Sequence, residues 1–187
     1  MSEIHTTYDW WYWPKVFSHG DLLELHDIFN KYSNEHAKDR PAKNVTKKIN
    51  LQFTNWQYLK DKLYFLEQEF LKVNRERFGC DIWPKYNNDV ILLNEYNETD
   101  KGEYDWHIDS SNNHICDLKF TMLINTSLSP YEGGKFKIFN GVEHHVKELD
   151  NPGDVVVFKS FKYHKVTPVT KGKRHSLSIF YYGPRYR

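Results

Sequence analysis

Residues 151–159 read NPGDVVVFK, a tight turn followed at once by a short strand. Asn, Pro, Gly and Asp favour turns, and a run of β-branched and aromatic residues after them is typical of a buried strand. From residue 88 onward, short apolar runs alternate in the same way with Gly, Pro, Asn and Asp. We therefore predict eight strands, at 90–96, 106–109, 119–125, 135–139, 145–149, 155–159, 164–169 and 174–182.

The first part of the chain has a helical period instead. Apolar residues recur every three or four positions between residues 20 and 36, and Ser18 or Asp21 is placed to cap the start of that helix. A second helix carries its apolar stripe from Trp56 to Val73 and ends near Gly79. Two helices before eight strands predict a mostly β fold with α support, a jelly roll whose N-terminal helices pack on the major sheet.

Composition bounds the class of protein. The 187 residues suffice for one sizeable core, so we expect a single domain over 1–187, with helical support at about 18–80 and the jelly-roll core at about 88–184. A net charge of +1 gives no field that would recruit nucleic acid, and we expect no such partner. The sequence shows neither a signal peptide nor a membrane span, which predicts a soluble, cytoplasmic protein with no membrane partner.

Two cysteines, Cys80 and Cys116, are too few for a secreted disulfide framework, and we expect free thiols. Oligomeric state is not indicated by any pattern in the sequence.

Four residues in the second half form a chemical pattern. His107 and Asp109 are two apart, so in an extended segment their side chains leave the same face, and His164 follows later. Two imidazoles and one carboxylate make the facial triad of non-haem Fe(II) sites, which leaves coordination positions open. Arg174 adds a guanidinium that can pair with the carboxylate of a co-substrate, and Ser176 shares its face. The pattern predicts an iron oxygenase.

Other histidines compete for these roles. His19 and Asp21 form a second His-x-Asp motif, but it stands where the first helix should begin, and its carboxylate is better explained as a cap. His144 and His145 are rival third ligands, yet no Arg follows either of them at the spacing seen after His164. A lone His would be read as a structural residue, whereas the combination favours a metal site.

The stretch 131–184 resembles a known family. It contains Tyr-Glu-Gly-Gly at 131–134, Pro-Gly-Asp at 152–154, and His-Lys-Val-Thr-Pro-Val-Thr at 164–170, which leads through Gly172 to Arg174. It resembles the iron and 2-oxoglutarate-dependent dioxygenases of the prolyl 4-hydroxylase type, and within them the PKHD-type hydroxylases. The resemblance covers about residues 88–184.

This resemblance implies a double-stranded β-helix in which His107, Asp109 and His164 hold Fe(II) and Arg174 holds 2-oxoglutarate. The implied reaction uses O2, with ascorbate as an optional addition, to hydroxylate a C–H bond while releasing succinate and CO2. Among peptide and small-molecule substrates, a peptidyl proline is the first candidate.

The chain departs from the family in one motif. The family often has Tyr-x-x-Gly-x-x-Tyr before the first metal-binding His, whereas here Tyr96 and Tyr104 are farther apart and Gly102 lies closer to the second tyrosine. Tyr104 keeps its place three residues before His107. Tyr96, Tyr104 and Ser176 are candidate co-substrate contacts, although Tyr96 is equally well read as a core aromatic and the Ser176 hydroxyl could bond to backbone.

Several segments around this site have simpler interpretations. Loops 97–103 and 110–117 are polar and should form its mouth, and Trp106 should point away from the metal. The aromatic cluster 10–13 is read as a strand that covers the core rather than as a binding platform. Five lysines are read as a solvated sheet edge rather than as a site for acidic substrates: Lys159, Lys162, Lys165, Lys171 and Lys173.

Two other functions fit the same residues. A non-enzymatic jelly-roll binding module would carry the histidines incidentally and need no iron. A metal enzyme on the same barrel could work without 2-oxoglutarate, with Arg174 holding some other anion.

Overall fold

The structure is a computed structural model that describes residues 8–33, 37–38, 45–109 and 115–186. Two helices were predicted near the N-terminus, and both are confirmed. Helix α1 (His19–Tyr32) begins with a capping box in which the Ser18 hydroxyl accepts from the Asp21 backbone N–H and the Asp21 carboxylate accepts from the Ser18 backbone N–H. Both candidate cap residues therefore take part, and the carboxylate of the second His-x-Asp motif is a helix cap.

Helix α2 (Trp56–Val73) continues into a short π-helical segment, η1 (Asn74–Phe78). It ends at Gly79, whose φ of 65° lies in the left-handed region that glycine adopts without strain.

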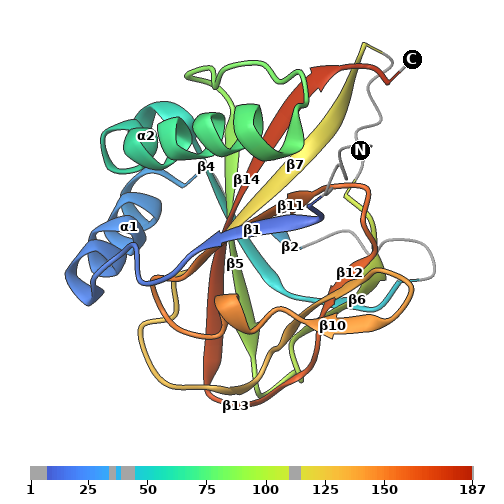
Figure 1. Cartoon of the computed structure of the whole chain (residues 1–187). Helices are drawn as coiled ribbons and strands as arrows, with labels where there is room; N and C mark the ends of the chain where they lie inside the picture. The colour runs from blue at the N-terminus through green and yellow to red at the C-terminus, as the bar shows by residue number, and fades with distance from the viewer. Residues whose placement is uncertain (1–7, 34–36, 39–44, 110–114, 187) are drawn as a thin grey trace.

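The strands form two facing sheets and a separate pair (Figure 1). The larger sheet has the order β1 (Trp10–Trp13), β11 (Val155–Lys159), β7 (Cys116–Asn125), β14 (Lys173–Pro184), β5 (Val90–Asn97), β4 (Asn50–Asn55) and β2 (Ala37–Lys38). The smaller sheet has the order β10 (Glu143–His145), β9 (Phe136–Phe139), β12 (His164–Val166), β6 (Glu103–His107) and β3 (Lys47–Lys48). Strands β13 (Val169–Lys171) and β8 (Glu132–Gly133) form the pair.

The larger sheet is buried on both faces. Its outer face packs on α1 and α2, through Phe29, Leu63 and Phe70 among others, as the predicted support layer requires (Figure 1). Its inner face meets the smaller sheet in a second core that includes Phe136 and Ile138. Because side chains alternate along β11, Val155 and Val157 join the first core, whereas Val156 and Phe158 join the second. The mostly β jelly roll with helices on its major sheet is thus confirmed.

Of the eight predicted strands only 155–159 keeps its predicted bounds, and three of the others differ most. The stretch 145–149 is wrong as a strand, because β10 ends at His145 and the 3-10 turn η2 (Lys147–Leu149) follows. The stretch 164–169 is divided into β12 and β13, since Pro168 has no N–H to donate to a ladder. Strand β6 covers 103–107 rather than 106–109. Strands β2, β3, β4 and β8 were not predicted.

Two smaller predictions concern the surface. Residues 10–13 do form a strand, β1, which pairs with β11. Four of the five lysines of the predicted edge lie in ion pairs with single carboxylates: Lys162 with Asp9, Lys165 with Glu143, Lys171 with Glu132 and Lys173 with Glu95. Each of these four lysines thus lies beside an acidic side chain. Both cysteines are free thiols. Within the described residues, no helix combines the length and hydropathy needed to cross a bilayer.

Candidate active site

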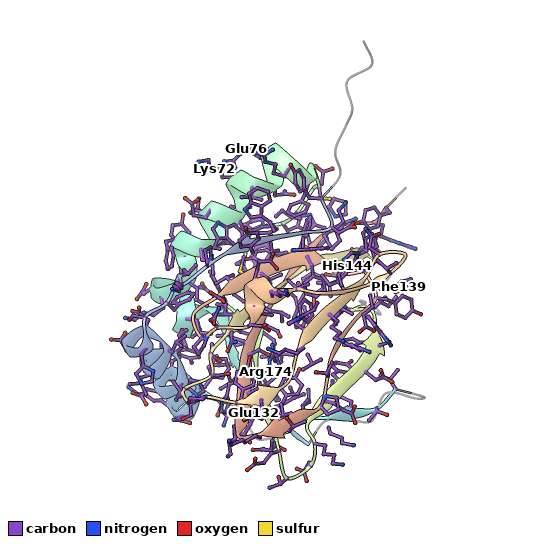
Figure 2. The ribbon with its side chains drawn as sticks, turned by 60° about the horizontal axis from the view of Figure 1, so that its bottom comes forward. Lys72, Glu76, Glu132, Phe139, His144 and Arg174 are labelled. Carbon is purple, nitrogen blue, oxygen red and sulfur yellow. The ribbon has the colours of Figure 1, made fainter. Side chains whose placement is uncertain are left out.

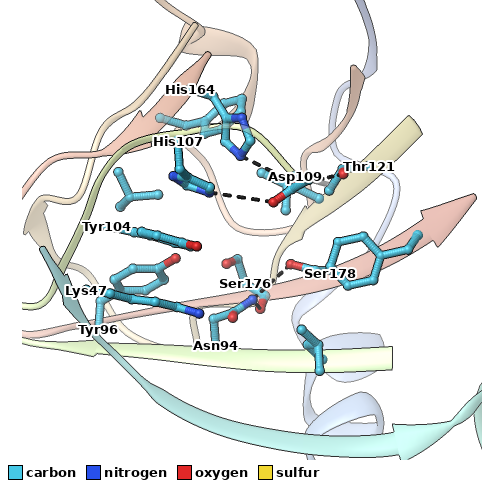
Figure 3. Close-up of a pocket in the computed structure, with 15 residues that line it drawn as sticks. Lys47, Asn94, Tyr96, Tyr104, His107, Asp109, Thr121, His164, Ser176 and Ser178 are labelled. Atoms are coloured by element: carbon cyan, nitrogen blue, oxygen red, sulfur yellow. Dashed lines mark hydrogen bonds and ion pairs between the residues drawn. The ribbon is translucent and has the colours of Figure 1, made fainter. Parts of the chain in front are cut away.

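The two site histidines come from neighbouring strands of the smaller sheet. His107 ends β6 and His164 begins β12, and the antiparallel register places them directly opposite each other. Their ring centroids lie 4.1 Å apart (Figure 3). Asp109 follows the end of β6, where its backbone N–H donates to the carbonyl of Ser160 at 3.0 Å. This hydrogen bond fixes the chain after the end of β6, where the Asp109 carboxylate points toward both imidazoles.

The three side chains converge on one point. Asp109 Oδ1 lies 3.6 Å from His107 Nε2, and Asp109 Oδ2 lies 3.5 Å from His164 Nε2. One ligand atom from each residue can be chosen so that all three lie within 4.8 Å of one another, and no other such group of His, Cys, Asp or Glu occurs in the described part of the chain. Two nitrogens and one oxygen in this arrangement suit a divalent transition metal such as Fe(II).

Backbone carbonyls fix the orientation of both rings. His107 Nδ1 lies 2.7 Å from the carbonyl oxygen of Asp105, and His164 Nδ1 lies 2.9 Å from that of Lys162. A carbonyl can only accept, so each Nδ1 carries the proton and each Nε2 keeps its lone pair for a metal. Burial and the neighbouring His164 lower the pKa of His107 to about 4, which keeps the ring neutral at pH 7.

The carboxylate of Asp109 is held by a residue from the opposite sheet. Thr121, on β7, donates its hydroxyl to Asp109 Oδ2 at 2.7 Å, and Ser160 Oγ lies 3.1 Å from the same hydroxyl. Thr121 is 1% exposed, so this is a buried, charge-assisted hydrogen bond. Thr121 therefore positions Asp109 against the two histidines.

A cavity of about 100 Å³ opens beside the three residues, between the two sheets (Figure 3). The ring of Tyr104 stacks on His107, with centroids 3.4 Å apart and planes 10° apart. Tyr96 closes another side, and burial raises the pKa of its hydroxyl, which stays protonated and able to donate. The remaining polar lining includes Asn94, Ser176, Ser178 and Lys47.

Arg174 lies inside the barrel at 1% exposure, whereas Lys72 and Glu76 mark the outer surface of the helical layer (Figure 2). Its Nη1 donates to Ser176 Oγ at 3.2 Å, while Nε and Nη2 have no partner. The guanidinium carbon is 5.2 Å from the centroid of the Tyr96 ring. A buried cation with unpaired N–H groups needs an acceptor, and a carboxylate supplies two oxygens to such a fork. The residues present thus suit both a metal and a carboxylate co-substrate.

The absence of a side chain at Gly134 leaves room for the Arg174 side chain. Gly134 has φ +57°, and a Cβ added there would lie 2.7 Å from Arg174 Cδ. Gly134 therefore contributes to the site, because a larger residue at this position would displace the Arg174 side chain.

The competing residues lie elsewhere. His145 pairs with Asp150 at 2.9 Å, and His144 packs on Trp10 with centroids 6.0 Å apart. Trp106 is not part of the cavity lining, and its ring contacts Phe139 with centroids 6.2 Å apart.

Of the two loops expected at the mouth, 97–103 contributes Asn97 and Asp100 to an outer groove that shares Lys47 with the cavity. Residues 110–114 of the other loop lie outside the described residues, and Cys116 and Asp117 belong to β7.

Four polar residues of the site were missed from the sequence: Thr121, Asn94, Ser178 and Lys47. Ser178 could have been found from its spacing, because it follows Ser176 by two on the same strand. Asn94 interrupts an apolar strand, and its side-chain amide donates to the Ser176 carbonyl at 3.0 Å and to Ser178 Oγ at 2.9 Å. Thr121 and Lys47 carry no local signal, since each reaches the site only through the pairing of distant strands.

Comparisons with known proteins agree with this geometry. The model of the 2OG-Fe(II) oxygenase superfamily matches residues 91–182, which include all three candidate ligands and Arg174. A PKHD-type hydroxylase of Synechococcus sp. (strain CC9605) is 40% identical over 74 residues, which are 38% of this chain and 33% of that protein. The match thus spans about a third of the length of this curated relative.

Solved structures show the same fold. A prolyl-4-hydroxylase of Pseudomonas putida superposes with a TM-score of 0.68 at 18% identity, over 96% of this chain and 95% of that one. A prolyl hydroxylase of Trichoplax adhaerens, in complex with a peptide fragment of the hypoxia inducible factor oxygen degradation domain, gives a TM-score of 0.68 at 14% identity, over 94% of this chain and 84% of that one.

Proposed function

Because the chain belongs to the 2OG-Fe(II) oxygenase superfamily, we propose that it is an Fe(II)- and 2-oxoglutarate-dependent hydroxylase whose metal ligands are His107, Asp109 and His164. The observation that carries this proposal is the convergence of these ligand atoms within 4.8 Å beside a cavity, together with a buried arginine that has unpaired N–H groups and donates to Ser176 in the cavity wall. With Fe(II), 2-oxoglutarate and O2 bound, the chemistry supplied is hydroxylation of a substrate C–H bond, with succinate and CO2 as the other products.

The protein's own contribution is to bind and orient. His107 and His164 present neutral Nε2 atoms, and Asp109 adds one negative charge that offsets part of a divalent cation's charge. Arg174 anchors the distal carboxylate of 2-oxoglutarate through the N–H groups that have no partner in the protein. The hydroxyls of Ser176 and Tyr96 stand beside that guanidinium and add further donors.

The enclosure of the site has a chemical role as well. The cavity is small and lies between two buried sheets, so the protein limits water at the reacting centre and keeps the substrate in one orientation. The ring of Tyr104 covers one face of His107 and restricts its rotation.

A peptidyl proline remains the first candidate substrate. The similar Pseudomonas protein is described as a prolyl-4-hydroxylase, and the similar Trichoplax protein binds a peptide. Both share the fold with this chain, which makes a peptide a reasonable first member of a substrate panel.

The decisive test is an anaerobic titration with Fe(II) and 2-oxoglutarate, followed by succinate measurement in air over a panel of peptides and small molecules. We expect a visible metal-to-ligand charge-transfer band in the wild-type protein, and a candidate that accelerates succinate release identifies the substrate. His164→Ala should abolish the band. The matched control His144→Ala removes an imidazole outside the site and should leave the band unchanged.

Each alternative predicts a different result. A metal enzyme that does not use 2-oxoglutarate would bind iron without forming the band, and a binding module would not bind iron at all. A band of wild-type intensity in His164→Ala would contradict the ligand assignment.

A further inference from the structure

The cavity wall that faces the metal ligands is formed by neighbouring strands of the larger sheet. Strand β5 contributes Asn94, strand β14 contributes Ser176 and Ser178, and all three side chains line the cavity. Figure 3 shows the Ser178 hydroxyl on the side of the pocket opposite the three candidate metal ligands. The sheet therefore places a hydroxyl across the cavity from the metal site.

Ser178 is a polar residue in apolar surroundings. It is 6% exposed on the central strand of the larger sheet, and its cross-strand partners are Leu92 on β5 and Leu123 on β7. A hydroxyl at such a place costs free energy unless it is hydrogen-bonded, and serine adds little apolar contact. The Asn94 side-chain amide, also 6% exposed, donates to Ser178 Oγ at 2.9 Å. The two polar side chains therefore hold each other within an apolar wall.

The direction of this hydrogen bond leaves one donor for the cavity. The Asn94 amide nitrogen also donates to the Ser176 carbonyl at 3.0 Å, and because a carbonyl can only accept, this contact identifies the nitrogen. The Ser178 oxygen therefore accepts from Asn94, and the hydroxyl proton points away from that amide. Since Ser178 lines the cavity, a ligand with an acceptor atom at this level can take the proton. Ser178 is thus the donor, and Asn94 is its positioning residue.

The order of residues along β14 indicates which part of a ligand Ser178 meets. Arg174, Ser176 and Ser178 occupy every second position of the strand, so they share a face, and two residues of a strand span about 6.6 Å. Arg174 Nη1 donates to Ser176 Oγ, which places the guanidinium near the level of Ser176. Beyond Ser178 the same face continues with Phe180, which lies opposite Thr121, the hydrogen-bond partner of a candidate metal ligand. The face therefore leads from the guanidinium past Ser178 to the metal site.

A five-carbon diacid suits this line of side chains. In 2-oxoglutarate the keto acid is separated from the distal carboxylate by two methylene groups. When the distal carboxylate pairs with Arg174 beside Ser176, a molecule that runs toward the metal site brings its keto acid to the level of Ser178. A carboxylate is the stronger kind of acceptor, because a hydrogen bond to it is charge-assisted. Ser178 is accordingly matched to the metal-binding end of the co-substrate.

We propose that Ser178, positioned by Asn94, donates a hydrogen bond to the keto acid end of 2-oxoglutarate and restrains the orientation of the co-substrate at the metal. This inference rests on the proposed function and deepens it, because it assigns a protein contact to the second end of the co-substrate. Arg174 and Ser176 hold the distal end, and Ser178 holds the end that the metal binds.

The test uses the whole chain with Fe(II) and 2-oxoglutarate in the absence of O2, and measures the midpoint and the wavelength of the charge-transfer band separately. Ser178→Ala should weaken 2-oxoglutarate binding about ten-fold, as expected when a hydrogen bond to a charged group is lost. At saturating co-substrate the band should move to shorter wavelength, because a donor to the keto acid stabilises the orbital that receives the charge. Asn94→Leu keeps the size of the side chain without its N–H groups, and it should move the band in the same direction.

Ser176→Ala is the matched control, because it removes a hydroxyl from the same face of the same strand. Its hydroxyl lies beside the guanidinium that anchors the distal carboxylate. The variant should therefore weaken 2-oxoglutarate binding while the saturated complex keeps the wild-type band wavelength. The comparison separates a contact at the keto acid from a general loosening of the pocket.

Three outcomes would overturn the proposal. The first is a wild-type band wavelength in Ser178→Ala, and with unchanged affinity this would assign the hydroxyl to the primary substrate. The second is an equal wavelength shift in Ser176→Ala. The third applies if Ser178→Ala does not fold or does not bind: Asn94→Leu then decides, and a wild-type wavelength in it contradicts the assignment. Failure of the proposed function would look different, because the wild-type protein would then form no band.

Discussion

Thr121→Val isolates one hydrogen bond of the metal site. The substitution keeps the shape of the side chain but removes the hydroxyl that donates to Asp109 Oδ2 at 2.7 Å. Partners that orient a metal-binding carboxylate typically contribute ten- to hundred-fold to metal affinity, which corresponds to about 1.4–2.7 kcal/mol. We expect Fe(II) affinity to fall by this factor, because Asp109 loses the group that holds it toward His107 and His164.

The assay is competition with a chromophoric chelator under anaerobic conditions, together with urea unfolding of the metal-free protein. Thr54→Val is the matched control: Thr54 is 2% exposed and donates its hydroxyl to the Tyr32 carbonyl at 3.1 Å, on the side of the larger sheet that faces the helices. Thr54→Val should lose about 1 kcal/mol of unfolding free energy, and Thr121→Val about 1.5–3 kcal/mol, because its hydrogen bond is to a charged group. Only Thr121→Val should lose metal affinity, and equal Fe(II) affinity in the two variants would refute the positioning of Asp109 by Thr121.

Two other perturbations test the co-substrate pocket and the pH dependence of stability. Gly134→Ala should displace Arg174, because the added Cβ would lie 2.7 Å from Arg174 Cδ, and should weaken 2-oxoglutarate binding at least ten-fold. Gly141→Ala is the control for backbone strain alone: its φ is +79° and no atom lies within 4 Å of the added Cβ, so it should cost about 1–2 kcal/mol of unfolding free energy without that loss of binding. Equal 2-oxoglutarate affinities in the two variants would contradict this. Burial alone would raise the pKa of Glu95, but hydrogen bonds from three side chains lower it to about 2: Asn50, Asn97 and His175. This carboxylate therefore stabilises the fold above its unfolded pKa of about 4.5, and the contribution is lost as pH falls toward 2. Between pH 6 and pH 3, the wild type should lose about 1–2 kcal/mol more than Glu95→Gln, after allowance for solvent screening, and parallel pH curves from urea unfolding would argue against it.

The parts of the fold that could be predicted are those whose apolar side chains face one core. The stripe of α2 is an example, since Leu59, Leu63 and Leu66 recur at helical spacing and are all 0–1% exposed. Strand β4 could not be recognised in the same way, because its one buried residue is Thr54 and its other side chains are half-buried or exposed. It is a strand because its backbone pairs with β5, and that pairing leaves no periodic mark in the sequence.

The same distinction applies to the site. Histidine and aspartate are common metal ligands and arginine binds carboxylates, so the spacing of these residue types was enough to select His107, Asp109, His164 and Arg174 from the sequence. Thr121 contributes through a contact between two sheets, and a threonine within an apolar strand looks like any other β-branched residue. Local sequence patterns can identify the side chains that bind metal and co-substrate. The side chains that position them, such as Thr121, depend on which strands pair or face each other in the fold.

The orientation of both imidazoles is set within two tripeptides, 105–107 and 162–164, since each ring donates to the carbonyl two residues before it. A ligand pair assembled in this way is already aligned in the empty protein, and the conformational entropy of holding the rings is lost during folding rather than on loading. Dehydration of the incoming ion is then the main barrier to uptake. Mixing folded, metal-free protein with Fe(II) should accordingly give a single fast phase, with no slower step from rearrangement of the chain.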